Sequence, residues 1–204
     1  MLNVKCSMIN LPKLILASGS PRRAEILTSV GWEFEKRVAD VDETEFFDEK
    51  PDDYVQRLAR EKAEAIAENY KNAWVLGADT IVVIDNKIIG KPKDLNDARR
   101  MLKMLSGNWH EVLTGVAIVK VSENNCKTRT NLQKTQVKFA ELSDAEIEFL
   151  VEKGKPLDKA GAYAVQAQAA LFIEEIKGDY WNVVGLPTNL VYQTINSFGQ
   201  KETG

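Results

Sequence analysis

Groups suited to binding phosphate are concentrated in residues 18–23, Ser-Gly-Ser-Pro-Arg-Arg. An apolar run at 14–17 precedes this segment and a helical pattern at 24–27 follows it, so we expect a strand, a tight turn and a helix. Ser20 suits the N-cap and Pro21 the first helical position. The free N–H groups of a helix N-terminus, two hydroxyls and two guanidiniums match phosphate oxygens. The stretch alone also allows a capped surface helix whose arginines contact only water.

Two carboxylates are candidates for acid–base or metal chemistry. Asp79 lies within an otherwise apolar strand pattern that continues through 81–84. An unpaired buried charge is costly, so Asp79 needs a metal, a cation or a reacting water, unless it lies exposed on an edge strand. Glu43 belongs to the acidic cluster 40–45, which we expect to form a loop. Asp79 and Glu43 suit a hard divalent ion such as Mg²⁺, which binds a few carboxylates plus water and substrate phosphates.

Three cations complete the candidate set. Lys62 lies at the edge of the apolar stripe of a helix expected over 51–70, where it either extends past the core to water or points into a cleft. Lys91 follows a strand end, and together with Lys62 and Arg22 it suits the neutralisation of a polyphosphate. This combination favours phosphoryl transfer to water, with the metal and a carboxylate activating the water and the cations stabilising the leaving group.

Other common catalytic signatures are missing from the sequence. Neither the G-x-x-x-x-G-K-[ST] phosphate loop nor the G-x-G-x-x-G dinucleotide fingerprint is present. His110 is the single histidine, and with the two separate residues Cys6 and Cys126 it does not make a usual zinc site. Because no G-x-S-x-G elbow accompanies His110, we interpret it as a hydrogen-bonded strand residue rather than a member of a catalytic triad.

The composition indicates an ordinary water-soluble protein. The chain has 204 residues and a net charge of −3, and its pI of about 5.4 argues against a general nucleic-acid-binding protein. The longest apolar runs are only as long as strands, and the N-terminal residues do not resemble a signal peptide. Two cysteines are too few for a disulfide framework, so we expect a cytoplasmic setting without membrane association.

The pattern of helices and strands predicts a mixed α/β fold. We expect strands at 14–17, 33–38, 74–84, 87–89, 109–121, 134–142 and 171–176, and helices at 21–30, 51–70, 95–105, 144–151 and after Pro187. The polar segment 122–131 is predicted to be a connecting turn, residues 85–86 a hairpin turn, and 143–146 a capping box. Long consecutive strands after 109 favour antiparallel pairing, and so an extended mixed sheet rather than a Rossmann fold.

A series of short motifs follows one another in a family-specific order. They are Ser18–Arg23, Glu61–Ala63, Gly77–Thr80, Gly90–Pro92, Ser106-Gly107 with His110, Thr114-Gly115, Asp158–Tyr163 and Val184–Pro187. In this order the chain resembles the Maf family over about residues 12–198. The resemblance implies a single domain over 1–204 with flexible ends at 1–10 and 199–204, and an elongated mixed sheet flanked by helices, similar to inosine triphosphatases, with two lobes around a central cleft. It also implies a homodimer.

The resemblance further implies a nucleoside triphosphate pyrophosphatase that uses Mg²⁺ or Mn²⁺ and releases a nucleoside monophosphate and pyrophosphate. Asp79 corresponds to the catalytic carboxylate, as proton acceptor or metal ligand, and Glu43 to its acidic partner. The residues that correspond to phosphate contacts are Ser18, Arg22, Lys62 and Lys91, and the two lysines are also candidate catalytic cations.

Substrate choice within the family is implied by three positions. One branch prefers dTTP and UTP, and another prefers 7-methyl-GTP; Arg22, Thr80 and Gln166 match the first branch, with modified pyrimidine nucleotides as further candidates. A glutamine amide offers the donor and acceptor that a pyrimidine edge requires. Ala164 and Ala167 replace family glycines, which would strain the backbone if either position needs a positive φ. The alternative function is a nucleotide-binding regulator of cell division and septum formation with little turnover.

Overall fold

The computed structural model describes residues 11–123 and 125–199, and these form the mixed α/β fold that the sequence predicts. The ends expected to be flexible, 1–10 and 199–204, lie outside the described residues except for Gly199. The strands are β1 (Leu14–Ala17), β2 (Phe34–Arg37), β3 (Ala73–Ile84), β4 (Lys87–Ile89), β5 (Trp109–Ser122), β6 (Asn125–Phe139) and β7 (Ile173–Lys177). The helices are α1 (Pro21–Ser29), α2 (Pro51–Ala67), α3 (Leu95–Leu105), α4 (Asp144–Gly154), α5 (Tyr180–Val184) and α6 (Thr188–Ser197), with 3-10 turns η1 (Pro156–Asp158), η2 (Ala160–Ala162) and η3 (Gln168–Leu171).

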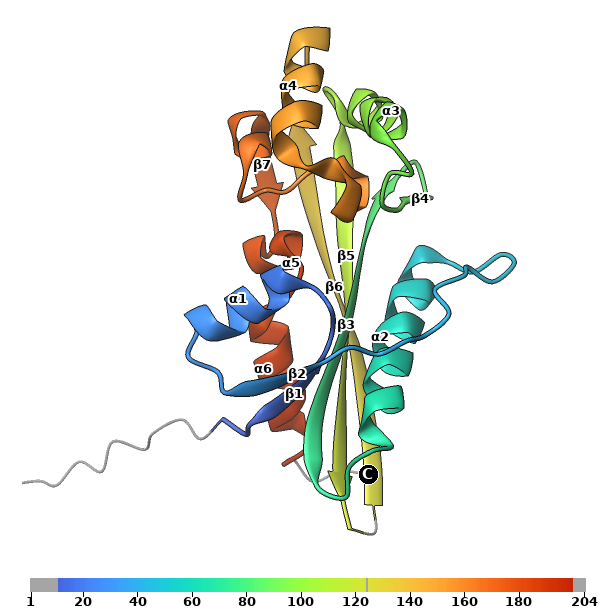
Figure 1. Ribbon diagram of the computed structural model, residues 1–204, viewed down its shortest axis with the longest axis vertical. Coiled ribbons are helices and arrows are strands. Elements are labelled where there is room, and N and C mark those ends of the chain that lie inside the picture. The colour runs from blue at the N-terminus through green and yellow to red at the C-terminus, as the bar shows by residue number, and fades with distance from the viewer. Residues whose placement is uncertain (1–10, 124, 200–204) are drawn as a thin grey trace, which may run out of the picture.

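Within the described residues the strands form one seven-stranded mixed sheet in the order β2-β1-β3-β5-β6-β7, with β4 paired to β3. The pairs β1–β2 and β1–β3 are parallel, and the remaining pairs are antiparallel. The long strands β3, β5 and β6 run along the length of the molecule (Figure 1). They therefore form a continuous frame, against which α1, α2, α5 and α6 pack toward one end and α3 and α4 toward the other.

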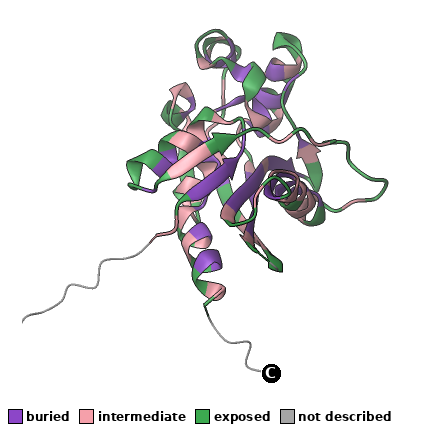
Figure 2. Ribbon diagram, turned by 60° about the horizontal axis from the view of Figure 1, so that its bottom comes forward, coloured by how far each residue is buried: buried purple, intermediate pink, exposed green. Residues whose placement is uncertain are grey.

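Strand β1 is buried on both faces. Leu14 and Leu16 pack with the core around α1 and α6, whereas Ile15 and Ala17 pack with the core beneath α2. A continuous apolar run is the pattern expected of a parallel strand covered on both sides. Figure 2 shows buried segments on the strands and on the helix sides that face them, and a further core surrounds α3 and α4 at the other end of the sheet.

Helix α2 approaches the sheet unusually closely because two of the strand residues beneath it are glycines. A Cβ atom added at Gly77 of β3 would lie 2.1 Å from the carbonyl oxygen of Ala59, and one at Gly115 of β5 would lie 2.2 Å from that of Val55. Gly115 is the direct cross-strand partner of Asp79. The two glycines thus let α2 lie against the part of the sheet that carries Asp79.

Replacing Gly115 with alanine is expected to push α2 away from the sheet. The overpacking should lower the free energy of unfolding by about 1–3 kcal/mol, and activity should fall because the side chains of α2 move away from Asp79. Urea unfolding measures the first effect. The control is Gly154→Ala, since an added Cβ at Gly154 meets nothing within 4 Å. Equal stability of the two variants would contradict this account of the close packing.

Several local predictions are confirmed. Asp85 and Asn86 have φ values of 50° and 59°, as a tight hairpin turn between β3 and β4 requires. Ser143 and Glu146 form the predicted capping box of α4. The helix at 95–105 has the bounds expected from its apolar stripe.

No helix among the described residues is long and apolar enough to cross a membrane.

Other local predictions are wrong. The segment 125–131, predicted as part of a connecting turn, belongs to β6, because its polar side chains lie on exposed or half-exposed positions of a hairpin arm paired with β5. The strand predicted from 171 begins at Ile173, after η3. The short helix α5, which Asp179 caps, is not among the predicted helices. Ser20 occupies the N-cap of α1, but its side chain makes no capping hydrogen bond.

Candidate active site

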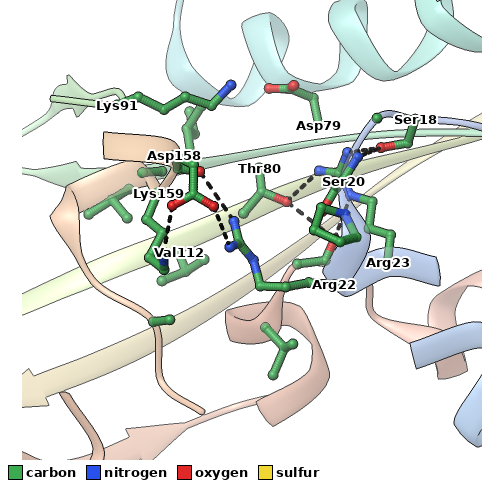
Figure 3. Close-up of a pocket in the computed structure, with 18 of the residues that line it drawn as sticks. Ser18, Ser20, Arg22, Arg23, Asp79, Thr80, Lys91, Val112, Asp158 and Lys159 are labelled. Carbon is green, nitrogen blue, oxygen red and sulfur yellow. Dashed lines mark hydrogen bonds and ion pairs between the residues drawn. The ribbon is translucent and has the colours of Figure 1, made fainter. Parts of the chain in front are cut away.

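A cavity of about 830 Å³ opens where several elements meet at the middle of the sheet. Its walls come from the turn between β1 and α1, the loop 38–43, helix α2, the middle of β3, the segment 90–91, the segment 157–166 and the end of α5. Figure 3 shows Asp79 and Lys91 along one side of this cavity and Arg22 and Arg23 on the other, with Asp158 below Lys91 and in contact with Arg22. Every site residue predicted from the sequence lines the cavity: Ser18, Arg22, Glu43, Lys62, Asp79, Thr80, Lys91 and Gln166.

Lys62 joins the two candidate carboxylates. Its Nζ donates to Oδ1 of Asp79 at 2.7 Å and lies 2.6 Å from Oε1 of Glu43. Both Lys62 and Asp79 are buried. The two alternatives left open by the sequence are thereby decided: Lys62 points into the cleft, and Asp79 lies on a central strand with a cation as its partner.

The electrostatics of this cluster keep Glu43 ionised. Partial burial raises the pKa of the Glu43 carboxyl, but the hydrogen bond from Lys62 and the charges of Lys62, Lys91 and Arg23 outweigh it, so the pKa lies below its usual value. Burial and the charges of Asp79 and Glu43 raise the pKa of the adjacent Tyr54 phenol to about 12. Glu43 therefore enters the site as an anion, and Tyr54 as a neutral hydrogen-bond donor.

The oxygen ligands fit a divalent cation that is completed by substrate. Glu43 and Asp79 both contact the same Nζ atom, so their carboxylates converge on one place. No group of three or more histidine, cysteine or acidic residues suitable for a metal occurs in the described part of the chain. Two carboxylates alone could hold a hard divalent cation only together with further oxygen ligands such as water or phosphate.

From the sequence, Arg23 is only one of two guanidiniums expected to match phosphate oxygens. The guanidinium of Arg23 is buried and donates to four oxygens: Oγ of Ser18 at 3.0 Å, the carbonyl of Ala78 at 2.8 Å, Oγ1 of Thr80 at 3.0 Å and the carbonyl of Gly185 at 2.9 Å. Burial lowers the pKa of Arg23 and the charge of Asp79 opposes this. Arg23 thus fixes the residues on both sides of Asp79.

Arg22 lies beside it in a different environment. Its guanidinium is partly exposed and contacts the carboxylate and the carbonyl of Asp158, each at 3.3 Å, across the cavity. Such a long, partly solvated ion pair is weak, so the guanidinium remains available to another anion. The hydroxyl of Ser18 accepts hydrogen bonds from the backbone N–H of Ser20 and from Arg23. These two contacts fix the direction in which the hydroxyl can donate its own proton.

The remaining predicted residues differ in how much of their polar surface is available. Lys91 and Gln166 are exposed at the cavity wall. In contrast, the hydroxyl of Thr80 already contacts Arg23, Thr114 and the carbonyl of Gly185. Thr80 therefore shapes the wall of the cavity, whereas Lys91 and Gln166 present groups to whatever occupies it.

The segment that carries Gln166 is anchored from below. Nε2 of His110 lies 2.7 Å from the hydroxyl of Tyr163, and burial lowers the pKa of His110 to about 4. His110 is accordingly the neutral, hydrogen-bonded strand residue that the sequence favours. Neither Ala164 nor Ala167 has a positive φ, so the expected strain at these two positions does not occur.

Known proteins resemble this chain over almost all of its length. The family model for Maf-like proteins matches residues 13–198. A dTTP/UTP pyrophosphatase of Symbiobacterium thermophilum is 48% identical over 189 residues, which are 93% of this chain and 95% of the relative. One of Bacillus cereus is 44% identical over 198 residues, 97% and 96% of the two chains. The solved structure of the Staphylococcus aureus Ham1 protein shares the fold, with a TM-score of 0.53, 13% identity and coverage of 91% and 99%. The chain therefore belongs to the Maf family.

Proposed function

We propose that this protein hydrolyses nucleoside triphosphates, with dTTP and UTP as its substrates, to the nucleoside monophosphate and pyrophosphate. The observation that carries the proposal is the Glu43–Lys62–Asp79 cluster facing an arginine-bearing helix N-terminus across one cavity. Relatives that are 44% and 48% identical over nearly the whole chain are named for this reaction. A purely regulatory nucleotide-binding protein is not favoured, because binding alone needs the cations but not a buried, converging pair of carboxylates.

Each side chain has a distinct part in the proposed reaction. Asp79 orients a water molecule and accepts its proton as the water attacks phosphorus at the α–β anhydride. Lys62 holds Asp79 and Glu43 in place until the substrate arrives, and then balances the charge that builds on the phosphates. Lys91, Arg22 and the hydroxyl of Ser18 contact the triphosphate and stabilise the departing pyrophosphate.

A divalent cation fits this site. Glu43 and Asp79 would hold Mg²⁺ or Mn²⁺ together with the triphosphate. The ion would lower the pKa of a coordinated water and offset the negative charge of the phosphates. The requirement for the triphosphate as an additional ligand accounts for a site built from only two carboxylates.

Base recognition is proposed for Gln166, which lines the same cavity. Gln166 presents an amide with both a donor and an acceptor, as the edge of a pyrimidine requires. Arg22 and Thr80, the other two residues that match the dTTP and UTP branch, line the same cavity. A net charge of −3 favours free nucleotides over nucleic acid as substrates.

We also propose a homodimeric, cytoplasmic enzyme.

The test is turnover of a nucleotide panel by the purified protein with Mg²⁺ or Mn²⁺, followed by identification of the products. The panel contains dTTP, UTP, 5-methyl-UTP, 7-methyl-GTP and the ordinary purine nucleotides. Monophosphate and pyrophosphate released chiefly from dTTP and UTP are the expected result. A preference for purines would reject the proposed role of Arg22, Thr80 and Gln166. Tight binding without turnover would reject the enzymatic function.

A further inference from the structure

The loop that carries Glu43 has little structure of its own. Residues 38–50 form neither helix nor strand, and most of them are exposed. Phe47, at the turn, is fully exposed, and Figure 1 shows this stretch extending away from the body of the protein before it enters α2. A loop of this kind is normally mobile, yet Glu43 must reach Lys62 at 2.6 Å. Other contacts must therefore hold the loop in place.

Arg57 of α2 provides most of those contacts. Its Nε and Nη2 donate to the two carboxylate oxygens of Glu49 at 2.7 and 2.8 Å, and Nη2 also donates to the carbonyl of Thr44 at 3.0 Å. The guanidinium lies 4.0 Å from the ring centroid of Phe46. Arg57 thus contacts the loop at three residues, one of which is the immediate neighbour of Glu43.

The ion pair between Arg57 and Glu49 has little of its side-chain surface exposed. The side chains of Arg57 and Glu49 are only 10% and 8% exposed. The hydrogen bonds that Arg57 donates to Glu49 lower the pKa of the Glu49 carboxyl and raise the pKa of the Arg57 guanidinium. A two-pronged arginine–carboxylate pair in such a place is stronger and more directional than an exposed ion pair.

The neighbouring turn of α2 completes the arrangement. Glu61, four residues after Arg57, accepts from its Nη1 at 3.2 Å and so fixes the guanidinium on the helix side. Tyr54, three residues before Arg57, donates from its hydroxyl to the carbonyl of Glu43 at 2.8 Å. Positions three and four apart share one helix face, so one side of α2 is devoted to the loop.

We propose that Arg57 is a positioning residue that holds the 38–50 loop on α2 and thereby places the Glu43 carboxylate against Lys62 and Asp79. Arg57 itself does not line the cavity, and it acts on the reaction only through Glu43. The inference rests on the role of Glu43 in the proposed function. It adds a second layer of residues to the site: Arg57, Glu49 and the ring of Phe46.

The decisive experiment is a double-mutant cycle with Arg57→Met and Glu43→Gln. Arg57→Met alone should lower kcat for dTTP by about 10- to 100-fold, the usual range for a lost supporting contact, with KM changed less. In the Glu43→Gln background, Arg57→Met should lower kcat by less than about 2-fold, because the Glu43 carboxylate through which Arg57 acts is already absent. Equal losses in both backgrounds would overturn the proposal.

Two further variants separate positioning from general stability. Arg57→Lys keeps the charge but not the planar fork, and should recover only part of the lost kcat. Arg60→Met is the matched control, because Arg60 is an exposed arginine of the same helix and should leave kcat unchanged. If Arg60→Met lowers kcat as much as Arg57→Met, the effect belongs to the helix and the proposal is wrong.

Hydrogen exchange tests independently of turnover whether Arg57 holds the 38–50 loop on α2. The backbone N–H of Phe46 donates to Glu49 at 3.1 Å, and that of Thr44 to Asp42 at 2.9 Å. Peptides covering 40–49 should exchange at least 10-fold faster in Arg57→Met than in the wild type, with peptides of β3 unchanged. Unchanged exchange in the loop would overturn the proposal. If the loop exchanges faster in Arg57→Met but the wild-type protein hydrolyses no nucleotide, only the proposed function is rejected.

Discussion

Replacing Asp79 with asparagine is expected to lower kcat for dTTP hydrolysis by about 10²- to 10⁴-fold, the usual contribution of a positioned general base. The amide has almost the same shape as the carboxylate, but it cannot accept a proton from water. It also removes the charge that pairs with Lys62 at 2.7 Å, so Glu43 becomes the only anionic partner of that lysine among the described contacts. Nucleotide affinity measured without a divalent cation should remain within a few-fold, since Arg22, Lys62 and Lys91 are all retained.

The measurement combines steady-state kinetics with calorimetric binding of dTTP. The matched control is Asp85→Asn, an identical change at the exposed hairpin turn after the same strand, where asparagine readily adopts the φ of 50°. Asp85→Asn should retain full turnover. Full turnover in Asp79→Asn would remove the carboxylate from the proposed chemistry, and a loss of binding equal to the loss of kcat would make Asp79 a binding residue instead.

The sequence predicts the site best where chemistry demands a rare arrangement. A carboxylate inside an apolar strand has few stable solutions, so Asp79 points to a buried partner. Lys62, at the edge of an apolar helical stripe, is that partner. The distance between them along the chain offers no clue to their contact. That contact depends on Gly77 and Gly115, whose missing side chains set how closely α2 can approach.

The sequence is less informative where burial decides the role of a side chain. Arg22 and Arg23 are adjacent and chemically identical, yet one is partly solvated and the other is enclosed with four acceptors. Helical geometry rotates neighbouring residues by about 100°, so one of the pair must face inward. The phase of α1 could have identified it, because Arg23 lies three residues before Ile26 and four before Leu27, both of which are buried.

The start of β6 was predicted wrongly because burial again was not visible in the sequence. Residues 125–131 are polar and read as a turn, but an exposed hairpin arm needs few apolar side chains when its partner strand provides the buried face. Backbone hydrogen bonds with β5 stabilise this part of β6. Such bonds do not depend on the side chains, so the amino-acid composition does not reveal them. The tight turn at 85–86 was predictable, in contrast, because its positive φ angles restrict the residue types directly.

Replacing Arg23 with methionine is expected to lower the free energy of unfolding by about 3 kcal/mol, since hydrogen bonds to a charged donor contribute about 1.5–3 kcal/mol each. The hydroxyls of Ser18 and Thr80 can turn to other partners, but the carbonyl oxygens of Ala78 and Gly185 lose the donors they have in the structure. Relief of the buried charge offsets part of this loss. Urea unfolding measures the change.

Arg22→Met is the internal control for this prediction. It removes the same group one position earlier, where its contacts among the described residues are two long, partly exposed ones to the carboxylate and the carbonyl of Asp158, and should cost less than about 1 kcal/mol. Arg23→Met should also reduce kcat, because Ala78 and Thr80 flank Asp79 and lose their common anchor. Equal stability of the two variants would mean that the four contacts of Arg23 do not hold β1, β3 and the end of α5 together. A stable Arg23→Met protein with reduced kcat would instead assign Arg23 to the reaction itself.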